Sequence, residues 1–370
     1  MNNSLDKLTI RGFKSIRELK DFELKNLNLF VGANGAGKSN LISFFRMLQS
    51  LMGGSLADFV RDSGGISDLL HNGRKATKYM EFEARFGCRG YRFKLKPDPG
   101  EGFALTDEAR YHTYNGVRGS WWEFGDSSDN SSLLVEETKG KSRDRQYSKP
   151  VYDAICSWRI YHFHDTSPTA AMRHAEIIED NKALRYDASN IGPFLLCLRN
   201  EERSCYDEIL NACRLVAPFL NDFLLTPQQL GPKTKVSLSW KAKGSDYPMQ
   251  PYHLSDGSIR FICLATALLQ SEPPSTIIID EPELGLHPEA VRVLAELIKD
   301  AAKRTQIVVA TQSPLLLDQF AIEDIVVVNR KEGQSTFERL KRSDFTEWLE
   351  DYSVGELWTK NVIQGGTTHE

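Results

Sequence analysis

The sequence predicts an α/β fold with a mixed central sheet, an antiparallel β subdomain and a helical insertion. Short apolar strand candidates alternate with amphipathic helices at both ends of the chain, which is typical of a largely parallel sheet. Between residues 80 and 122, apolar residues recur at every second position, which predicts an antiparallel meander. From residue 168 to residue 223 the apolar spacing is helical.

The N-terminal region is predicted to contain strands at residues 8–10 and 27–31, then a glycine-rich loop and a helix at residues 40–51. The loop reads GANGAGKS and fits GxxxxGK[ST] without deviation. Its backbone N–H groups would point at phosphates, at the positive end of the helix that follows. Lys38 is predicted to bridge the β- and γ-phosphates of ATP, and Ser39 to coordinate Mg²⁺. The predicted nucleotide contacts are Asn34, Gly35, Ala36, Gly37, Lys38, Ser39 and Asn40.

The middle of the chain carries weaker signals. Residues 126–149 are polar and predict a loop or a weakly ordered insertion, whose basic stretch at 139–149 is either solvated or in contact with a phosphate backbone. The helices predicted between 168 and 223 sustain no heptad pattern, so short packed helices are favoured over a coiled-coil arm. His162 and His164 alternate with Tyr161 and Phe163, which favours packed side chains over metal ligands.

The C-terminal region begins with a strand predicted at residues 236–240 and continues as helix, strand, helix and strand. The apolar run at 276–279 predicts a strand buried on both faces, and it ends in Asp280 and Glu281. We expect Asp280 to lie near Mg²⁺ and Glu281 to act as the general base that polarises the attacking water. Upstream, Ser255 and Gly257 precede an apolar helix at 259–269; taken alone, this is an ordinary helix cap.

The glycine loop, an LSxG segment and a strand ending in Asp-Glu occur in the order that resembles the ABC ATPase head. The segments LTIRGFKSI, LFVGANGAGKSNLI, LSDGSIRFICLATALL, IIIDEPELGLHP and VVATQSPLLLD are similar to those of SMC/RecF-like predicted ATPases, a group that includes the OLD-family ATPase domains. The C-terminal EWLEDYSVGELWTKNVIQGG resembles the ending of stand-alone bacterial members. The resemblance is dense over residues 5–52 and 250–366 and thin between them.

This resemblance implies a P-loop NTPase fold of the ABC-ATPase head type and four segments. Residues 1–75 would form the N-terminal part of the head with Walker A, and residues 76–165 an antiparallel β region with a polar loop. Residues 166–228 would form the helical lid or arm. Residues 229–370 would complete the head with the signature, Walker B and switch motifs.

The resemblance also implies roles for particular residues. Ser255 and Gly257 would bind the γ-phosphate held by a second copy, so that a homodimer sandwiches two ATP molecules. Arg11 and Lys14 match an N-terminal segment that approaches the nucleotide. The segment that crosses the dimer interface is matched by Glu283, Leu286, His287 and Pro288.

Two positions depart from the family pattern. Gln312 occupies the switch position, which is most often histidine; its amide can orient a water but cannot take up a proton. Glu281 would then act without a switch histidine, so slow turnover is expected. No glutamine marks the Mg²⁺-sensing loop, and His71 or Asn72 lies nearest the expected place.

Composition sets the remaining expectations. The chain has 370 residues, a net charge of −4 and six scattered cysteines without a CxxC pair, which argues against a disulfide framework and a structural zinc site. Without a signal pattern or a membrane-spanning run, a cytoplasmic protein that uses no membrane is expected. Too few residues follow the switch segment for the TOPRIM nuclease domain of OLD-family nucleases.

Two functions of different class remain open. The first is an ATP-hydrolysing molecular switch that controls a protein effector supplied in trans, such as a nuclease, in anti-phage defence. The second is a RecF-like ATPase that binds duplex DNA in repair or maintenance, with strong salt dependence. The net charge of −4 and the expected lack of a TOPRIM domain favour the first.

Overall fold

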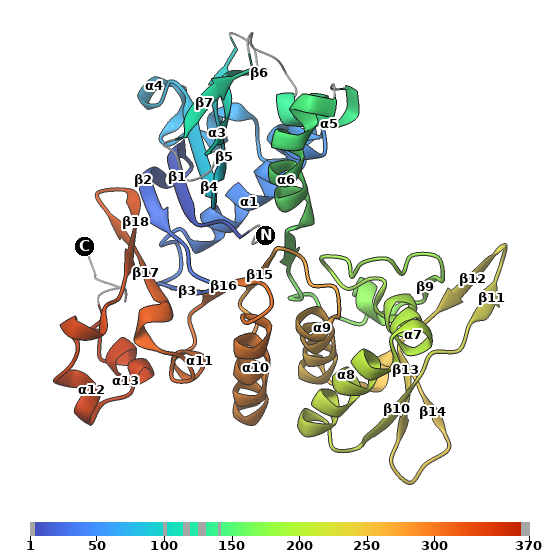
Figure 1. Ribbon diagram of the computed structural model, residues 1–370. Helices are drawn as coiled ribbons and strands as arrows, with labels where there is room; N and C mark the ends of the chain where they lie inside the picture. The colour runs from blue at the N-terminus through green and yellow to red at the C-terminus, as the bar shows by residue number, and fades with distance from the viewer. Residues whose placement is uncertain (1–3, 99–101, 114–118, 125–130, 140–141, 364–370) are drawn as a thin grey trace.

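A six-stranded sheet lies at the centre of the computed structural model, which describes residues 4–98, 102–113, 119–124, 131–139 and 142–363 (Figure 1). The strand order is β18-β17-β3-β16-β15-β8, and only the pair of β17 and β18 is antiparallel. This mixed sheet confirms the predicted fold class. Its strands are β3 (Leu27–Val31), β8 (Arg159–Tyr161), β15 (Thr276–Asp280), β16 (Gln306–Thr311), β17 (Ile325–Lys331) and β18 (Gln334–Arg339).

Both faces of this sheet are buried, which explains its continuous apolar strands. Successive side chains of a strand point to opposite faces. Ile277 and Ile279 accordingly pack into one hydrophobic core, and Ile278 packs into the other. The long helices of the first core are α7 (Ile191–Glu201), α8 (Arg203–Val216), α9 (Asp256–Leu269) and α10 (Pro288–Ala301).

The second core lies between the central sheet, α1 (Lys38–Met52) and a second, antiparallel sheet. Phe44 of α1 contacts Phe13 and Phe82 of that sheet, and Phe45 packs edge-on against Trp158. The predicted meander is confirmed, and two N-terminal strands extend it to the order β2-β1-β4-β5-β6-β7. The strands are β1 (Lys7–Phe13), β2 (Ile16–Glu23), β4 (Met80–Phe86), β5 (Arg89–Pro97), β6 (Phe103–His112) and β7 (Ser120–Glu123).

The loop predicted at residues 126–149 is wrong where the structure describes it, because α5 (Ser132–Lys139) and α6 (Ser142–Ser157) occupy most of it; residues 126–130 and 140–141 lie outside the described part. Leu133, Val151 and Ile155 are buried in the second core, and the charged residues between them hide the apolar spacing. Arg145 and Lys149 of the basic stretch bind the carboxylate of Glu137 at 2.6 and 3.2 Å.

The strand predicted at residues 236–240 is two strands in different sheets. Val236 of β12 pairs with Glu176 of β9, whereas Ser239 of β13 pairs with Leu224 of β10, so the chain changes sheet between them. The predicted short packed helices are α7 and α8, whereas residues 176–177 and 220–224, where the apolar spacing predicted helix, form the strands β9 and β10. The remaining strands are β9 (Glu176–Ile177), β10 (Leu220–Leu224), β11 (Gln228–Leu230), β12 (Lys233–Val236), β13 (Ser239–Ala242) and β14 (Pro248–Met249).

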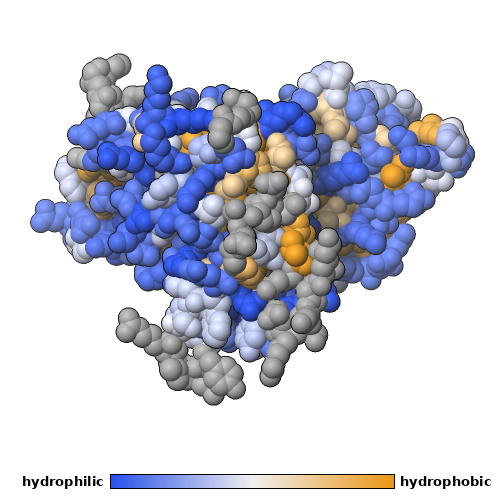
Figure 2. Space-filling view, turned by 90° about the horizontal axis from the view of Figure 1, so that it is seen from above, coloured by the Kyte–Doolittle hydropathy of each residue, from blue (hydrophilic) through white to orange (hydrophobic). Residues whose placement is uncertain are grey.

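The remaining helices are short, and several of them contribute buried residues to the two cores. They are α2 (Leu56–Asp62), α3 (Ile66–Leu69), α4 (Gly73–Ala76), α11 (Pro314–Leu317), α12 (Trp348–Asp351) and α13 (Val354–Thr359), with 3₁₀ turns η1 (Ala171–Arg173), η2 (Pro251–His253), η3 (Ile322–Asp324) and η4 (Arg342–Asp344). None of the helices in the described ranges has the length and apolar character needed to span a bilayer. The face seen from above is mainly hydrophilic, with hydrophobic residues in small areas (Figure 2).

Candidate nucleotide and metal site

The register of the central sheet brings the residues that are predicted to bind and hydrolyse the nucleotide to one edge. Asp280 of β15 pairs with Ala310 of β16, and Thr311 pairs with Val31 of β3, all in parallel. The glycine loop after β3, the acid pair at the end of β15 and Gln312 after β16 therefore emerge side by side. This is the carboxyl edge of a parallel sheet, where open α/β folds bind their ligands.

The glycine loop connects β3 to the N-terminus of α1. Gly35 and Gly37 have φ angles of +79° and +119°, which only glycine adopts readily. Asn34 and Gly35 are exposed, whereas Gly37 packs against the hydroxyl of Ser335. A loop of this shape at a helix N-terminus presents backbone N–H groups to an anion. The geometry fits a chain of phosphates.

Lys38 lies beneath this loop rather than in solvent. Its Nζ donates to the carbonyl oxygens of Gly32 at 2.6 Å and Ala33 at 3.3 Å. Burial lowers the pKa of Lys38, while the carboxylates of Glu281 and Asp280 oppose that shift. The amine is thus placed between the loop that would hold phosphates and the acids at the end of β15.

Gln312 joins the loop to the predicted base. Its Nε2 donates to Asn34 Oδ1 at 2.7 Å and to Glu281 Oε1 at 2.6 Å. Glu281 has a φ of +43°, an unusual value for a residue with a side chain, and its N–H donates to the carbonyl of Ala310. The amide at the switch position therefore orients the carboxylate of Glu281.

Glu283 is a buried acid that contacts the backbone of Gln312 and the side chain of Thr311. Its Oε1 accepts from the Thr311 hydroxyl at 2.6 Å and from the Gln312 N–H at 3.4 Å, while Oε2 is buried without a hydrogen bond among the described residues. Burial raises the pKa of Glu283. The sequence places Glu283 at a dimer interface only through the family resemblance; within one chain it contacts the switch segment.

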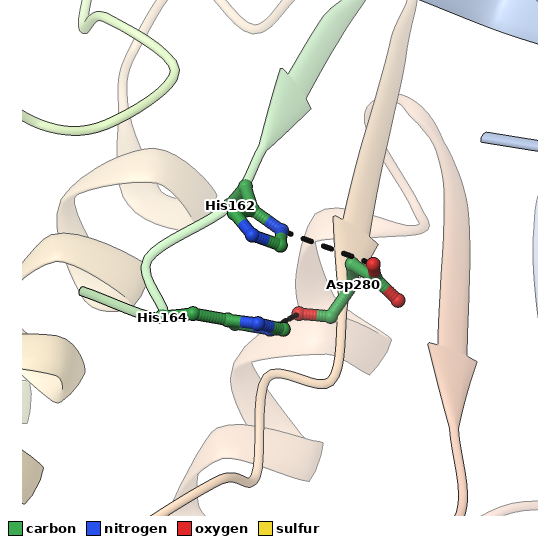
Figure 3. A group of neighbouring side chains, drawn as sticks. All are labelled: His162, His164 and Asp280. Carbon is green, nitrogen blue, oxygen red and sulfur yellow. Dashed lines mark hydrogen bonds and ion pairs between the residues drawn. The ribbon is translucent and has the colours of Figure 1, made fainter. Parts of the chain in front are cut away.

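Two histidines lie beside Asp280 (Figure 3). His164 Nε2 is 3.0 Å from the backbone oxygen of Asp280, and His162 Nδ1 is 3.8 Å from its Oδ2. Burial and the neighbouring His164 lower the pKa of His162 to about 4, so its imidazole is neutral near pH 7. Burial also raises the pKa of Asp280. The sequence favoured packed side chains here, but both histidines are partly exposed and stand at the acid pair.

Ser255 caps the N-terminus of α9, as the sequence predicts. Its Oγ accepts from the Ser258 N–H at 3.1 Å, and the residue is exposed. Gly257 lies so close to the carbonyl of Gly285 that a Cβ would approach it to 2.6 Å. The signature segment is therefore packed against the segment that follows the acid pair.

Arg260 joins α9 to two other backbone segments, residues 163–164 and Leu284. Its guanidinium donates to the carbonyl oxygens of Phe163 at 2.8 Å, His164 at 2.9 Å and Leu284. The residue is 5% exposed, and burial lowers its pKa. Arg260 was not predicted from the sequence, where its only signal is a cation within an apolar helix.

The N-terminal cations predicted to approach the nucleotide have partners of their own. Arg11 bonds Glu18 at 2.8 Å and Glu81 at 3.0 Å within the antiparallel sheet. Lys14 Nζ donates to the Ser43 hydroxyl on α1 at 2.8 Å, and burial lowers its pKa.

His71 and Asn72, nearest the expected place of a Mg²⁺-sensing residue, contact each other, and His71 Nδ1 contacts the carbonyl of Lys14. The side chains beside Asp280 are His162 and His164. Ser39, at the start of α1, is exposed and offers a hydroxyl oxygen.

Comparisons with known proteins identify the family and the fold of the chain. A family model described as "AAA domain, putative AbiEii toxin, Type IV TA system" matches residues 27–318. A search of curated proteins found no match. The chain is similar to the solved structure of an Smc head bound to the C-winged helix domain of ScpA, with 18% identity and a TM-score of 0.57 over 93% of this chain and 99% of that one.

A second similar structure is an Smc head domain with an extended coiled coil, bound to the C-terminal domain of ScpA and derived from Pyrococcus furiosus. It is 17% identical with a TM-score of 0.55 and covers 94% of this chain and 99% of that one. At these identities the likeness shows the fold alone. It confirms the predicted P-loop NTPase fold of the head type.

Proposed function

The chain belongs to the family of AAA domains whose model matches residues 27–318, within the SMC-like ABC-type ATPases, and on that premise we propose that it hydrolyses ATP to ADP and phosphate. The observation that carries this proposal is the amide of Gln312. It bonds both Asn34 of the glycine loop and Glu281 at the acid pair. A nucleotide seated on the loop would place its terminal phosphate where these groups meet.

Each residue has a defined part in the proposed hydrolysis. Backbone N–H groups of the glycine loop and Lys38 bind the phosphates and stabilise the charge that develops on them. Glu281 takes a proton from the attacking water as the water oxygen bonds to the γ-phosphorus, while the bond between the γ-phosphorus and its bridging oxygen breaks and ADP leaves. Gln312 holds Glu281 and cannot itself accept that proton. Turnover is therefore expected to be slow.

Ser39 and Asp280 fit Mg²⁺, because a hydroxyl and a carboxylate are the oxygen donors that this cation prefers. Mg²⁺ held there would supply neutralisation of charge on the phosphate oxygens. Burial raises the pKa of Asp280 by disfavouring its charged form, and a cation held beside the carboxylate would offset that cost.

We place the second half of the site on another copy of the chain. Ser255 is exposed at the N-terminus of α9, and its hydroxyl contacts Ser258 within the same chain. A helix N-terminus that carries an exposed serine can accept a phosphate from a second protomer. A homodimer that closes on ATP through Ser255 and Gly257 and opens after hydrolysis would be a two-state switch.

The proposed switch acts on a protein effector supplied in trans. The Smc heads similar in fold are bound to domains of ScpA, which supports a protein as the partner class. The family description names a toxin of a type IV toxin–antitoxin system, which supports a role in bacterial defence against phage. An effector such as a nuclease in the cytoplasm would then respond to the ATP-bound dimer.

The test is a comparison of wild type, Lys38→Ala and Glu281→Gln by ATPase assay and by sizing with light scattering. Lys38→Ala is expected to lose ATP binding. Glu281→Gln is expected to bind ATP, lose turnover and accumulate as a dimer. A Glu281→Gln monomer at saturating ATP would refute the dimer, and full ATP affinity of Lys38→Ala would refute the nucleotide site.

Linear duplex DNA in the same assay separates the two functions that the sequence left open. A rate indifferent to DNA supports the protein effector. A DNA stimulation that salt abolishes would replace it with a RecF-like DNA-binding ATPase.

A further inference from the structure

Two imidazoles project from the end of β8 toward the end of β15. His162 and His164 are two residues apart in extended chain, so they lie on the same face. Their rings are 3.9 Å apart between centroids. Tyr161 pairs with Ile279 in parallel, which places the segment that follows β8 next to Asp280, as Figure 3 shows.

The spacing of the donor atoms suits a shared cation. One ring nitrogen of each histidine and one carboxylate oxygen of Asp280 lie within 4.8 Å of one another. His162 Nδ1 is buried, has no hydrogen bond among the described residues and lies 3.8 Å from Asp280 Oδ2. With metal–nitrogen bonds of about 2.1 Å in tetrahedral geometry, ligand atoms lie about 3.4 Å apart. Small side-chain rotations would therefore bring the three donor atoms to the spacing of metal ligands.

The surroundings hold these donors in place. In the tautomer that carries its proton on Nε2, His164 donates to the backbone oxygen of Asp280 at 3.0 Å, which leaves Nδ1 with a lone pair. Metal-binding histidines commonly donate their second ring N–H to a carbonyl or carboxylate. Arg260 fixes the backbone on both sides by bonding the carbonyl oxygens of Phe163 and His164.

We propose that His162, His164 and Asp280 form a binding site for a divalent transition-metal cation of the Zn²⁺, Co²⁺ and Ni²⁺ class. Imidazole nitrogen suits these cations, whereas Mg²⁺ takes oxygen ligands. The site differs in donor type from the Mg²⁺ site proposed at Ser39 and Asp280, although both use Asp280. It goes beyond the proposed ATPase, because it binds its cation without nucleotide.

The test is a titration of chelator-treated, nucleotide-free full-length protein with Co²⁺, followed by visible absorption. Wild type is expected to bind one Co²⁺ with bands of nitrogen and oxygen ligation and without thiolate charge transfer. His162→Ala and His164→Ala are each expected to weaken binding at least tenfold. A hundredfold excess of Mg²⁺ is expected to displace little Co²⁺.

The matched control is His174→Ala, which removes an exposed histidine that directly follows η1. It is expected to change Co²⁺ affinity less than twofold. His164→Gln keeps an amide donor for the carbonyl of Asp280, so it replaces His164→Ala should that variant fail to fold. An unchanged Co²⁺ spectrum in either site variant, or displacement by equimolar Mg²⁺, overturns the proposal. So does wild type that binds no Co²⁺. None of these outcomes depends on ATP hydrolysis.

Discussion

Arg260→Leu tests whether the signature helix holds the segments around Asp280. The guanidinium donates to three backbone carbonyl oxygens, those of Phe163, His164 and Leu284, from a position 5% exposed. Leucine fills part of the same volume but donates no hydrogen bond. The perturbation therefore leaves three partly buried carbonyl groups without their partner.

The magnitude follows from those three bonds. A hydrogen bond from a charged donor contributes about 1.5–3 kcal/mol, and the lower end applies because burial of the guanidinium already costs free energy. Loss of all three is expected to lower the free energy of unfolding by about 4 kcal/mol. Arg260→Lys keeps the charge but not the planar fork, so it should recover only about one bond of this loss.

The assay is urea denaturation followed by circular dichroism, with Arg292→Leu as the control. Arg292 is exposed and pairs with Glu289 one turn away at 2.8 Å, so its loss should cost less than about 0.5 kcal/mol. A loss below about 1 kcal/mol for Arg260→Leu, or full recovery by Arg260→Lys, would refute the proposed tie between the segments.

Three further substitutions probe the site. Gln312→Ala is expected to lower kcat about tenfold through the lost bond to Glu281, with the KM for ATP unchanged; a changed KM alone would contradict this. Burial raises the pKa of Glu283, so its ionisation opposes folding, and stability is lost as pH rises through that raised pKa. Glu283→Gln should thus stabilise the protein against urea at pH 8 but not at pH 4; equal effects at both values would argue against it. Gly37→Ala, at φ +119° and without room for a Cβ, should lower stability by at least about 1 kcal/mol in thermal unfolding, more than Gly35→Ala, where a Cβ meets open space.

Local patterns were enough to predict most of the core. The glycine loop between β3 and α1, the buried strand ending at Asp280 and the meander each have a period or motif that the chain carries within a few residues. The helices α5 and α6 could not be predicted that way. Their burial is set by contact with the second core, and their charged residues obscure the apolar positions.

The candidate site also contains residues that local motifs predict and residues that only tertiary contacts bring together. Lys38, Asp280 and Glu281 belong to sequence motifs, so they could be predicted as site residues from the sequence. His162 and His164 are in no motif, and their neighbour Asp280 is more than a hundred residues away in the chain. Only the pairing of β8 with β15 in the sheet brings them together. Two histidines at alternate positions after an apolar strand were the available signal.

The segment between β8 and η1 links the two halves of the proposed site. Arg173 of η1, which follows this segment, donates to Asp256 at 2.8 Å and to the carbonyl oxygens of Pro251 and Leu254, next to Ser255. Arg260 returns from α9 to the histidine end of the same segment. Because each charged hydrogen bond costs about 1.5–3 kcal/mol to break, the N-terminus of α9 and the histidine pair are expected to move as one body. When Ser255 of this chain binds the phosphate held by a second copy, that contact would therefore act on the groups beside Asp280 in this chain.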